Sequence, residues 1–332
     1  TFIINHNRPM LDNNNVTTCD YETFWVDRIN FLNQTITRYI SSIILFVGNV
    51  GLVFTCLIFW QPTFRQSACT MYFIAAGLSQ VFTFNFALLT RILQFGYNIN
   101  TATMYLWFCK LRFYLFYISI AIPRYNLILA SIDRYFASSR NAFYRQWSSP
   151  RIVIRLIIGN IVFWCLIYIQ VLIFYEIDGN QCLPQSGSYR TFFSIYIMID
   201  SGILPFCLML IFGLLTIRNV RRSRRLIAPS IRINSNRISR KDNQLYRMLA
   251  SQIFLFVILN LLNPCYLIYQ SFTMYTDKST LRTSAESFVS NMTYILIYLS
   301  FGLTFPTFLI SSEMFRQEFI QVIQRRVFRR DL

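Results

Sequence analysis

The chain has 332 residues, of which 55% are hydrophobic and only 14% are charged, and its formal net charge is +17. A soluble domain carries about 25% charged residues, whereas here the apolar residues form blocks long enough to cross a hydrocarbon core of roughly 30 Å. This composition excludes an ordinary soluble domain and indicates a polytopic α-helical membrane protein. The basic residues cluster between the apolar blocks, as in loops that face anionic lipid, so they do not predict nucleic acid binding.

The first 36 residues are polar and rich in asparagine, and they show no helical apolar periodicity. They are expected to form a tail ahead of the first span. Asn15-Val16-Thr17 and Asn33-Gln34-Thr35 are glycosylation sequons, although so short a motif also occurs unused. His6 is the only histidine, which excludes a histidine-based metal site or catalytic triad.

Seven apolar blocks follow and predict seven membrane-spanning helices. They cover about 39–60, 69–93, 107–135, 152–175, 191–217, 245–270 and 288–310. Four polar side chains are expected to be buried within them: Asn49, Gln80, Arg124 and Asp200. Each of the last three spans contains one proline, which frees backbone carbonyls and kinks a helix. We therefore expect kinks at Pro205, Pro264 and Pro306.

Charge sets the orientation, because cytoplasmic loops carry an excess of lysine and arginine. Arginines are concentrated after the third, fifth and seventh spans, while the alternate loops are nearly neutral. The N-terminus is therefore predicted to be extracellular. We divide the chain into an extracellular tail (1–36), a seven-transmembrane domain (37–311), and a cytoplasmic surface helix and tail (312–332). In the last part, apolar residues at helical spacing predict an amphipathic surface helix, with a frayed tail as the alternative.

The third span ends in Asp133-Arg134-Tyr135, at its predicted inner water boundary. The adjacent carboxylate can hold the guanidinium until a partner takes it over. The triplet alone is a weak signal, because it also occurs by chance in soluble helices. Cys19, Cys109 and Cys182 fall in segments predicted to be outside the cell, where an oxidising environment permits a disulfide.

The chain resembles the rhodopsin-like (class A) family of G-protein-coupled receptors from about residue 39 to residue 319. The resemblance rests on landmarks that occur in the family's order: Gly48-Asn49, Cys109, Asp133-Arg134-Tyr135, Trp164, Cys182, Pro205, Pro264, Pro306 and Phe315-Arg316. It implies a disulfide between Cys109 and Cys182. It also implies that Arg134 is freed to meet a heterotrimeric G protein when the sixth helix swings outward.

Several positions in three of the spans depart from the family's pattern. Gln80 stands where the family has an aspartate that helps to hold a sodium ion, which argues against sodium regulation. Leu262 replaces an aromatic residue two positions before the sixth-span proline. The seventh span reads Phe305-Pro306-Thr307-Phe308-Leu309 and lacks the family's asparagine before the proline and its tyrosine. The inner activation relay is therefore expected to differ, or the receptor to couple weakly.

Arg124 is unusual, because a full charge at mid-bilayer depth costs at least about 2.5–3.5 kcal/mol on insertion scales. In the family its position lies close to the fifth-span proline, here Pro205, and Asp200 is the only acid in that span. We predict that Arg124 and Asp200 face each other, directly or through water. In the alternative, Arg124 uses carbonyls freed by Pro123, and Asp200 points into the ligand cavity.

A ligand site is expected in the outer half of the bundle, where helices enclose a cleft. The candidate residues are Arg91, Phe113, Phe116, Tyr117, Tyr266, Tyr269, Gln270, Tyr294 and Tyr298. Such aromatics also serve as packing or interfacial residues. Arg91 suits either an anionic group, such as a peptide carboxylate, or a snorkelling contact with lipid headgroups. The family's amine receptors carry an acid where Phe116 stands, so a peptide ligand is favoured over a monoamine.

The sequence thus predicts a multi-pass plasma-membrane receptor that binds an extracellular ligand and activates a heterotrimeric G protein at its cytoplasmic face. Membrane lipid is the other expected partner, and no cofactor or metal is expected. A transporter or channel is the alternative, since Arg124 and Asp200 also suit a mid-membrane coupling site, but no repeated halves are visible. No catalytic constellation is visible, so the chain is not expected to be an enzyme.

Overall fold

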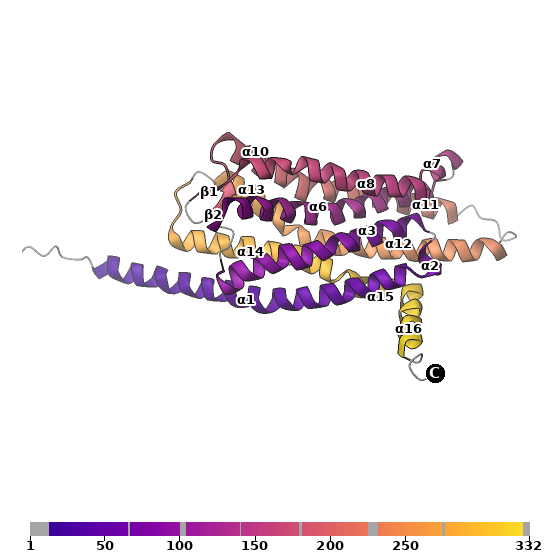
Figure 1. Ribbon diagram of the computed structural model, residues 1–332, viewed down its shortest axis with the longest axis horizontal. Helices are drawn as coiled ribbons and strands as arrows, with labels where there is room; N and C mark the ends of the chain where they lie inside the picture. The colour runs from indigo at the N-terminus through magenta and orange to yellow at the C-terminus, as the bar shows by residue number, and fades with distance from the viewer. Residues whose placement is uncertain are drawn as a thin grey trace, which may run out of the picture.

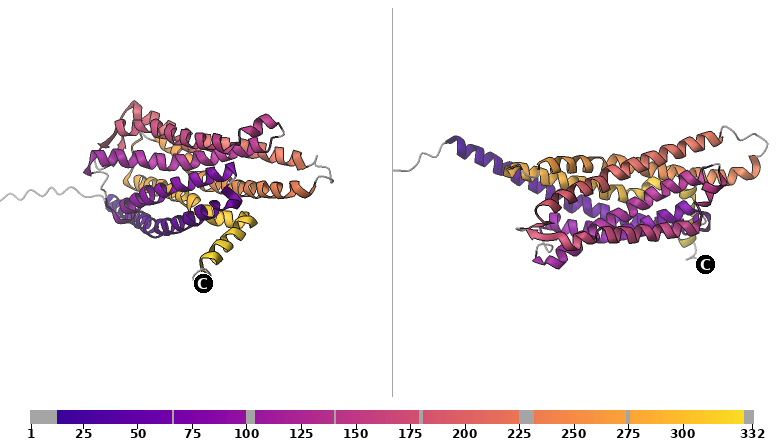
Figure 2. Two further views of the ribbon diagram at one scale, coloured as in Figure 1. Left: turned by 45° about the vertical axis from the view of Figure 1, so that its right-hand side comes forward. Right: turned by 90° about the horizontal axis from the view of Figure 1, so that it is seen from above.

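The computed structural model describes residues 13–65, 67–99, 104–139, 141–178, 181–224, 232–273 and 276–327. These residues form a bundle of long helices with one short two-stranded hairpin (Figure 1 and Figure 2). Six of the described helices are long and apolar enough to cross a membrane, and a bent pair brings the total to seven spans. The predicted all-α seven-span fold is confirmed.

The first span belongs to helix α1 (Asn13–Phe59), which is 47 residues long and projects beyond the rest of the bundle (Figure 1). The predicted tail is therefore helical from Asn13 onward, although its sequence shows no helical apolar periodicity, while residues 1–12 lie outside the described ranges. The face that α1 buries here carries Asn33, Thr37 and Ser41, at a helical spacing of four residues. Because this stripe is polar, a search for apolar periodicity does not detect the helix.

The second and third spans pack against each other. The short α2 (Pro62–Arg65) precedes the second span. That span consists of α3 (Ala68–Phe82), η1 (Thr83–Leu88), α4 (Leu89–Arg91) and η2 (Ile92–Gly96), where η denotes a π-helical turn. The third is α6 (Leu106–Ala137), which continues through Pro123 without a break, and the short α7 (Ala142–Gln146) follows it. Pro123 leaves the Ser119 carbonyl without its helical N–H donor, and the Thr83 hydroxyl donates to that carbonyl at 2.6 Å.

The fourth and fifth spans are joined by the hairpin. The elements are α8 (Pro150–Ile167), α9 (Ile169–Phe174), β1 (Tyr175–Asp178), β2 (Gln181–Pro184), α10 (Ser188–Ile197), η3 (Met198–Ile203) and α11 (Leu204–Arg224). The two strands are antiparallel, with Tyr175 opposite Pro184. A disulfide joins Cys182 of β2 to Cys109 of α6, with 5.8 Å between the Cα atoms, as the family resemblance implied. We call this the disulfide end of the bundle.

The last spans are interrupted near their prolines. They consist of α12 (Arg232–Asn260), α13 (Leu262–Thr273), α14 (Thr280–Gly302) and α15 (Thr304–Ser311). The sixth span breaks just before Pro264, and the seventh bends by 45° between α14 and α15, just before Pro306. In the fifth span, the π-helical turn η3 ends immediately ahead of Pro205. All three predicted kinks thus coincide with irregular helix, because proline removes a backbone donor.

The opposite end of the bundle, which we call the Arg134 end, is closed by phenylalanine. The rings of Phe59, Phe308 and Phe315 are fully buried and stand 5.4–5.7 Å apart. Phe315 belongs to α16 (Glu313–Val327), which leaves the bundle at a steep angle to its long axis (Figure 1). The described part of the C-terminal segment is therefore the predicted helix rather than a frayed tail.

Candidate functional site

At the Arg134 end, an acid and a base form a buried pair at the close of α6. Arg134 donates from Nη2 and Nε to Oδ2 of Asp133, at 2.7 Å and 3.1 Å. The second carboxylate oxygen accepts from the hydroxyl of Ser148 at 2.6 Å. Tyr135 is half-buried, and its ring lies 5.9 Å from that of Phe212 on α11. The carboxylate therefore holds the guanidinium in a charge-assisted contact that a competing partner can replace.

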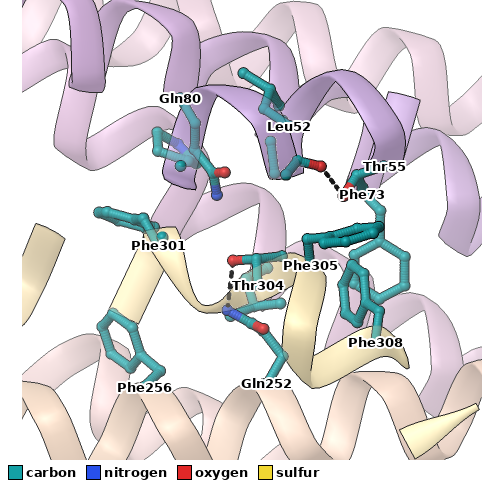
Figure 3. Close-up of a pocket in the computed structure, with 17 residues that line it drawn as sticks. Leu52, Thr55, Phe73, Gln80, Gln252, Phe256, Phe301, Thr304, Phe305 and Phe308 are labelled. Carbon is teal, nitrogen blue, oxygen red and sulfur yellow. Dashed lines mark hydrogen bonds between the residues drawn. The ribbon is translucent and has the colours of Figure 1, made fainter. Parts of the chain in front are cut away.

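Between this pair and the middle of the bundle lies a cavity of about 30 Å³, shown in Figure 3 and mostly lined by apolar residues. Gln80 is buried on its wall, and Gln252 of α12 donates from Nε2 to Oγ1 of Thr304 on α15 at 3.1 Å. The Gln252 carbonyl oxygen has no partner among the described residues. The volume is enough for one or two water molecules. No carboxylate lines the cavity, so its walls offer a cation only neutral oxygen atoms.

The seventh-span departures from the family's pattern fall in an aromatic cluster beside this cavity. Phe305 stacks on Phe54 with ring centres 5.7 Å apart, and its ring lies 6.0 Å from that of Phe315. Leu309 packs against the same core. Leu262 is instead exposed on the surface of the sixth span, away from the interior of the bundle. Apolar packing therefore occupies the positions where the family has an asparagine and a tyrosine.

Arg124 and Asp200 are both buried, each 3% exposed, but their side chains do not form the predicted direct ion pair. The Asp200 carboxylate accepts hydrogen bonds from the hydroxyls of Tyr125 and Tyr168, at 2.7 Å and 2.6 Å. Arg124 donates from Nη1 to the backbone carbonyl of Asp200 at 3.5 Å. The two residues are therefore neighbours, as predicted. Arg124 contacts the backbone carbonyl of Asp200 rather than its carboxylate, and pairing of the two side chains through water stays a prediction.

The π-helical turn explains this contact. The Leu204 N–H bonds the carbonyl of Ile199, five residues earlier, so the same register would pair the Asp200 carbonyl with residue 205. Residue 205 is a proline and has no N–H. The Asp200 carbonyl is thus free to accept from side chains, and it accepts from the Tyr125 hydroxyl at 3.3 Å as well as from Arg124. In the alternative, Arg124 uses a carbonyl freed by Pro123. The structure instead places the Thr83 hydroxyl on that carbonyl, and the hydrogen bond that Arg124 makes goes to Asp200.

At the disulfide end, the structure brings together most of the predicted ligand residues. Arg91, Phe113, Phe116, Tyr117, Tyr294 and Tyr298 all face the interior of this half. A small cavity of about 20 Å³ lies below them and is lined in part by Phe116, Tyr117, Tyr294 and Arg124. Tyr269 and Gln270 are exposed, and Tyr269 donates to Glu286 at 2.8 Å, so these two do not join the group. Tyr266 is half-buried with its ring 6.4 Å from that of Tyr269.

Arg91 is held inside the bundle rather than snorkelling to its surface. Its Nε donates to Oδ1 of Asn291 at 2.7 Å, and its guanidinium lies 4.3 Å from the ring centre of Tyr294. Asn291 in turn donates to Oδ1 of Asn33 at 2.7 Å and to the hydroxyl of Thr37 at 2.6 Å. The extended part of α1 therefore positions Arg91 through Asn291.

This network bears on the predicted glycosylation sites. Asn33 is buried, and its carboxamide is bonded to Asn291, so glycosylation at Asn33 is incompatible with this structure. Asn15 lies within α1, and its glycosylation stays a prediction. Asn49 was expected to be buried but is only half-buried. It exchanges hydrogen bonds with Asn85 at 2.8 Å and 3.3 Å, which satisfies both amides at the face of the bundle.

Sequence reasoning missed a second buried arginine at the disulfide end. Arg112 is 9% exposed, donates from Nη2 to Oε1 of Gln94 at 2.7 Å, and lies 5.5 Å from the ring centre of Phe113. It stands three residues after Cys109 in the same apolar run. The criterion that singled out Arg124, a charge inside a span, would have found it as well.

The structure has seven spans, with a disulfide-tied hairpin over an aromatic pocket at one end and a buried acid–arginine pair at the other. These features are those of a seven-helix receptor. A family model described as 7 transmembrane receptor (rhodopsin family) matches residues 53–303. The chain belongs to this family, the class A G-protein-coupled receptors, which are not enzymes. Membership implies signalling through a G protein in response to a ligand. No individual curated protein matches the chain significantly.

Proposed function

We propose that this receptor lies in the plasma membrane with its disulfide end outside, binds an extracellular peptide there, and activates a heterotrimeric G protein at its Arg134 end. The orientation is supported by charge, because basic residues mark the cytoplasmic side. At the Arg134 end these are Arg145 on α7, Arg151 at the start of α8, Arg218 near the end of α11 and Arg316 on α16 (Figure 1). No observation favours the transporter or channel alternative for a member of this family.

A peptide ligand is supported by the lining of the outer pocket. Aromatic rings from α6 and α14 dominate it, and the charged groups that the structure places beside them are arginines. Phe116 stands where an amine ligand would need an acid. Aromatic rings with a few fixed polar groups suit a ligand that has both apolar and anionic parts.

The ion pair between Asp133 and Arg134 is the observation that supports activation of a G protein at this end. The guanidinium is buried, and its partner carboxylate is already fixed by Ser148, so release of Arg134 changes a defined contact. On activation, movement of the sixth span would open this end and offer the guanidinium to the G protein.

The test is G-protein activation in cells that express the full chain, screened against a peptide library. Arg134→Ala is expected to lower ligand-stimulated activation at least tenfold at equal surface expression. Arg145→Ala is the matched control, because Arg145 is an exposed arginine on α7 at the same end. Signal that survives in the Arg134 variant, or no signal for any G-protein class from a well-expressed surface protein, would refute the proposal.

A further inference from the structure

The disulfide end contains two buried arginines without an acidic partner. Arg91 is 8% exposed and Arg112 is 9% exposed. Neither forms an ion pair within the described part of the chain, where Asp178 and Glu286 at this end pair with other basic residues. Arginine stays protonated in proteins, so both groups are cations. A buried charge without a counter-charge is costly, and such groups mark functional sites in membrane proteins.

The neutral partners of the two arginines fix their geometry but leave their charge uncompensated. Arg91 is oriented by the carbonyl oxygen of Asn291, and Arg112 by that of Gln94. Gln94, which accepts from Arg112, stands three residues after Arg91 in the second span, so the two arginines approach the same part of the bundle. Two like charges in one region of low dielectric repel each other, and an anion placed between them relieves that repulsion.

A third group at the same place also lacks a partner. Tyr298 is fully buried, and its hydroxyl has no hydrogen-bond partner among the described residues. It stands one helical turn after Tyr294 on α14, the ring on which Arg91 stacks. Buried hydroxyl groups are nearly always bonded, so an orphan donor beside two cations indicates a missing acceptor. A carboxylate has two oxygens and about four acceptor positions, which is enough for all three donors.

The rings beside the arginines indicate what is attached to the anion. The Arg91 guanidinium stacks on Tyr294, whose ring lies 5.8 Å from that of Phe116. Phe116 in turn lies 6.2 Å from Phe113, the ring beneath Arg112. The arginines are thus joined by a continuous aromatic wall, and the cavity below begins at the same Phe116 and Tyr294. An apolar group next to the carboxylate would pack against this wall.

We propose that Arg91, Arg112 and Tyr298 form a carboxylate-binding site for a ligand that carries an apolar group beside its carboxylate. The C-terminal residue of a peptide and the end of an acyl chain share this chemistry. Asn291 is a positioning residue, since it holds Arg91 from α14 and is itself held by α1. This inference rests on the proposed receptor function, because it names the chemistry of the ligand.

The test measures the melting temperature of the purified full chain in detergent with a matched pair of probes. N-acetyl-Phe-Phe as the free acid and the same dipeptide as its C-terminal amide differ only in the anionic group. The acid is expected to raise the melting temperature by several degrees at about 10 mM. At that concentration, even a ligand with a dissociation constant of about 1 mM stabilises a fold measurably. The amide is expected to raise it by less than one degree. Octanoate serves as the acyl probe and shows which source of carboxylate the site prefers.

Arg91→Gln and Arg112→Gln are expected to remove the acid-dependent shift, while Arg190→Gln, a half-buried arginine paired with Asp178 outside the pocket, retains it. Because each of the first two changes deletes an uncompensated buried charge, the ligand-free melting temperature should stay the same or rise. The ligand-free melting temperature therefore shows whether a variant has lost the site or has lost its fold. An equal shift with the amide, an acid shift that survives in both variants, or no shift with either acid would overturn the proposal. The assay needs no G protein, so failed coupling would refute the proposed function and leave this result intact.

Discussion

Replacing Gln252 by leucine is expected to raise ligand-independent G-protein activation about fivefold. Gln252 on α12 donates to Thr304 on α15 across the cavity in Figure 3. The sixth span carries α12, and class A activation is expected to swing this end of the span away from the seventh. The hydrogen bond would then exist only in the inactive state, where it would stabilise that state selectively.

The magnitude follows from the value of one neutral hydrogen bond, which is about 0.5–1.5 kcal/mol net. At about 1 kcal/mol, its loss shifts a two-state equilibrium roughly fivefold towards the active form. The fold should tolerate leucine, because the Gln252 carbonyl oxygen has no partner among the described residues and its removal relieves an unpaired acceptor. The melting temperature of the variant should therefore remain close to that of the wild type.

The assay is basal G-protein activation per receptor at the cell surface. Thr304→Val should have a similar effect, and the double variant should not exceed either single variant by much, since one bond is lost only once. Ser251→Ala is the control, because the neighbouring Ser251 hydroxyl donates to the Met248 carbonyl of its own helix rather than across the cavity. Unchanged or lower basal activity in the Gln252 variant, at normal surface expression, would refute the reasoning.

Three further predictions follow from contacts elsewhere in the bundle. Reversing the charges of Arg124 and Asp200 together should not restore surface expression lost in either single reversal, because Arg124 contacts a backbone carbonyl; recovery to half the wild-type level would contradict this. Cys109→Ser should lower stability by about 4 kcal/mol in the loop-closure model for a separation of 73 residues, measured as a lower melting temperature without reductant. Gly202→Ala would place a Cβ 2.6 Å from the α13 proline and cost about 1–3 kcal/mol, whereas Gly213→Ala meets nothing within 4 Å and should be neutral in the same melting assay.

The spans and kinks were predictable because their signals are local. Run length identifies a membrane helix, and Pro205, Pro264 and Pro306 each act on the turn that precedes them. The N-terminal part of α1 was missed for the opposite reason. Its buried face is defined by hydrogen bonds from Asn291, which is 258 residues away from Asn33, and no local pattern carries that information.

The site was predictable by residue type but not by partner. Buried charges stand out in an apolar sequence, so Arg124 and Asp200 were identified correctly as interior groups, whereas for Arg91 the interior was one of two alternatives. Their contacts depend on the rotation of each helix about its axis. The two tyrosines that bond Asp200 come from different spans, at separations of 75 and 32 residues. Periodicity does not distinguish such tyrosines from the many others in this chain.

The interior prolines help to decide where polar chemistry appears in this bundle. A carbonyl that loses its helical donor in a hydrocarbon environment must find another. The carbonyl freed by Pro123 accepts from Thr83. The π-helical turn ahead of Pro205 makes the freed carbonyl that of Asp200, which accepts from Tyr125 and Arg124. In an ordinary α-helical register the freed carbonyl would belong to the next residue instead. The contact of Arg124 therefore follows from the register of one turn, and a search for charge pairs in the sequence finds the right neighbours but the wrong bond.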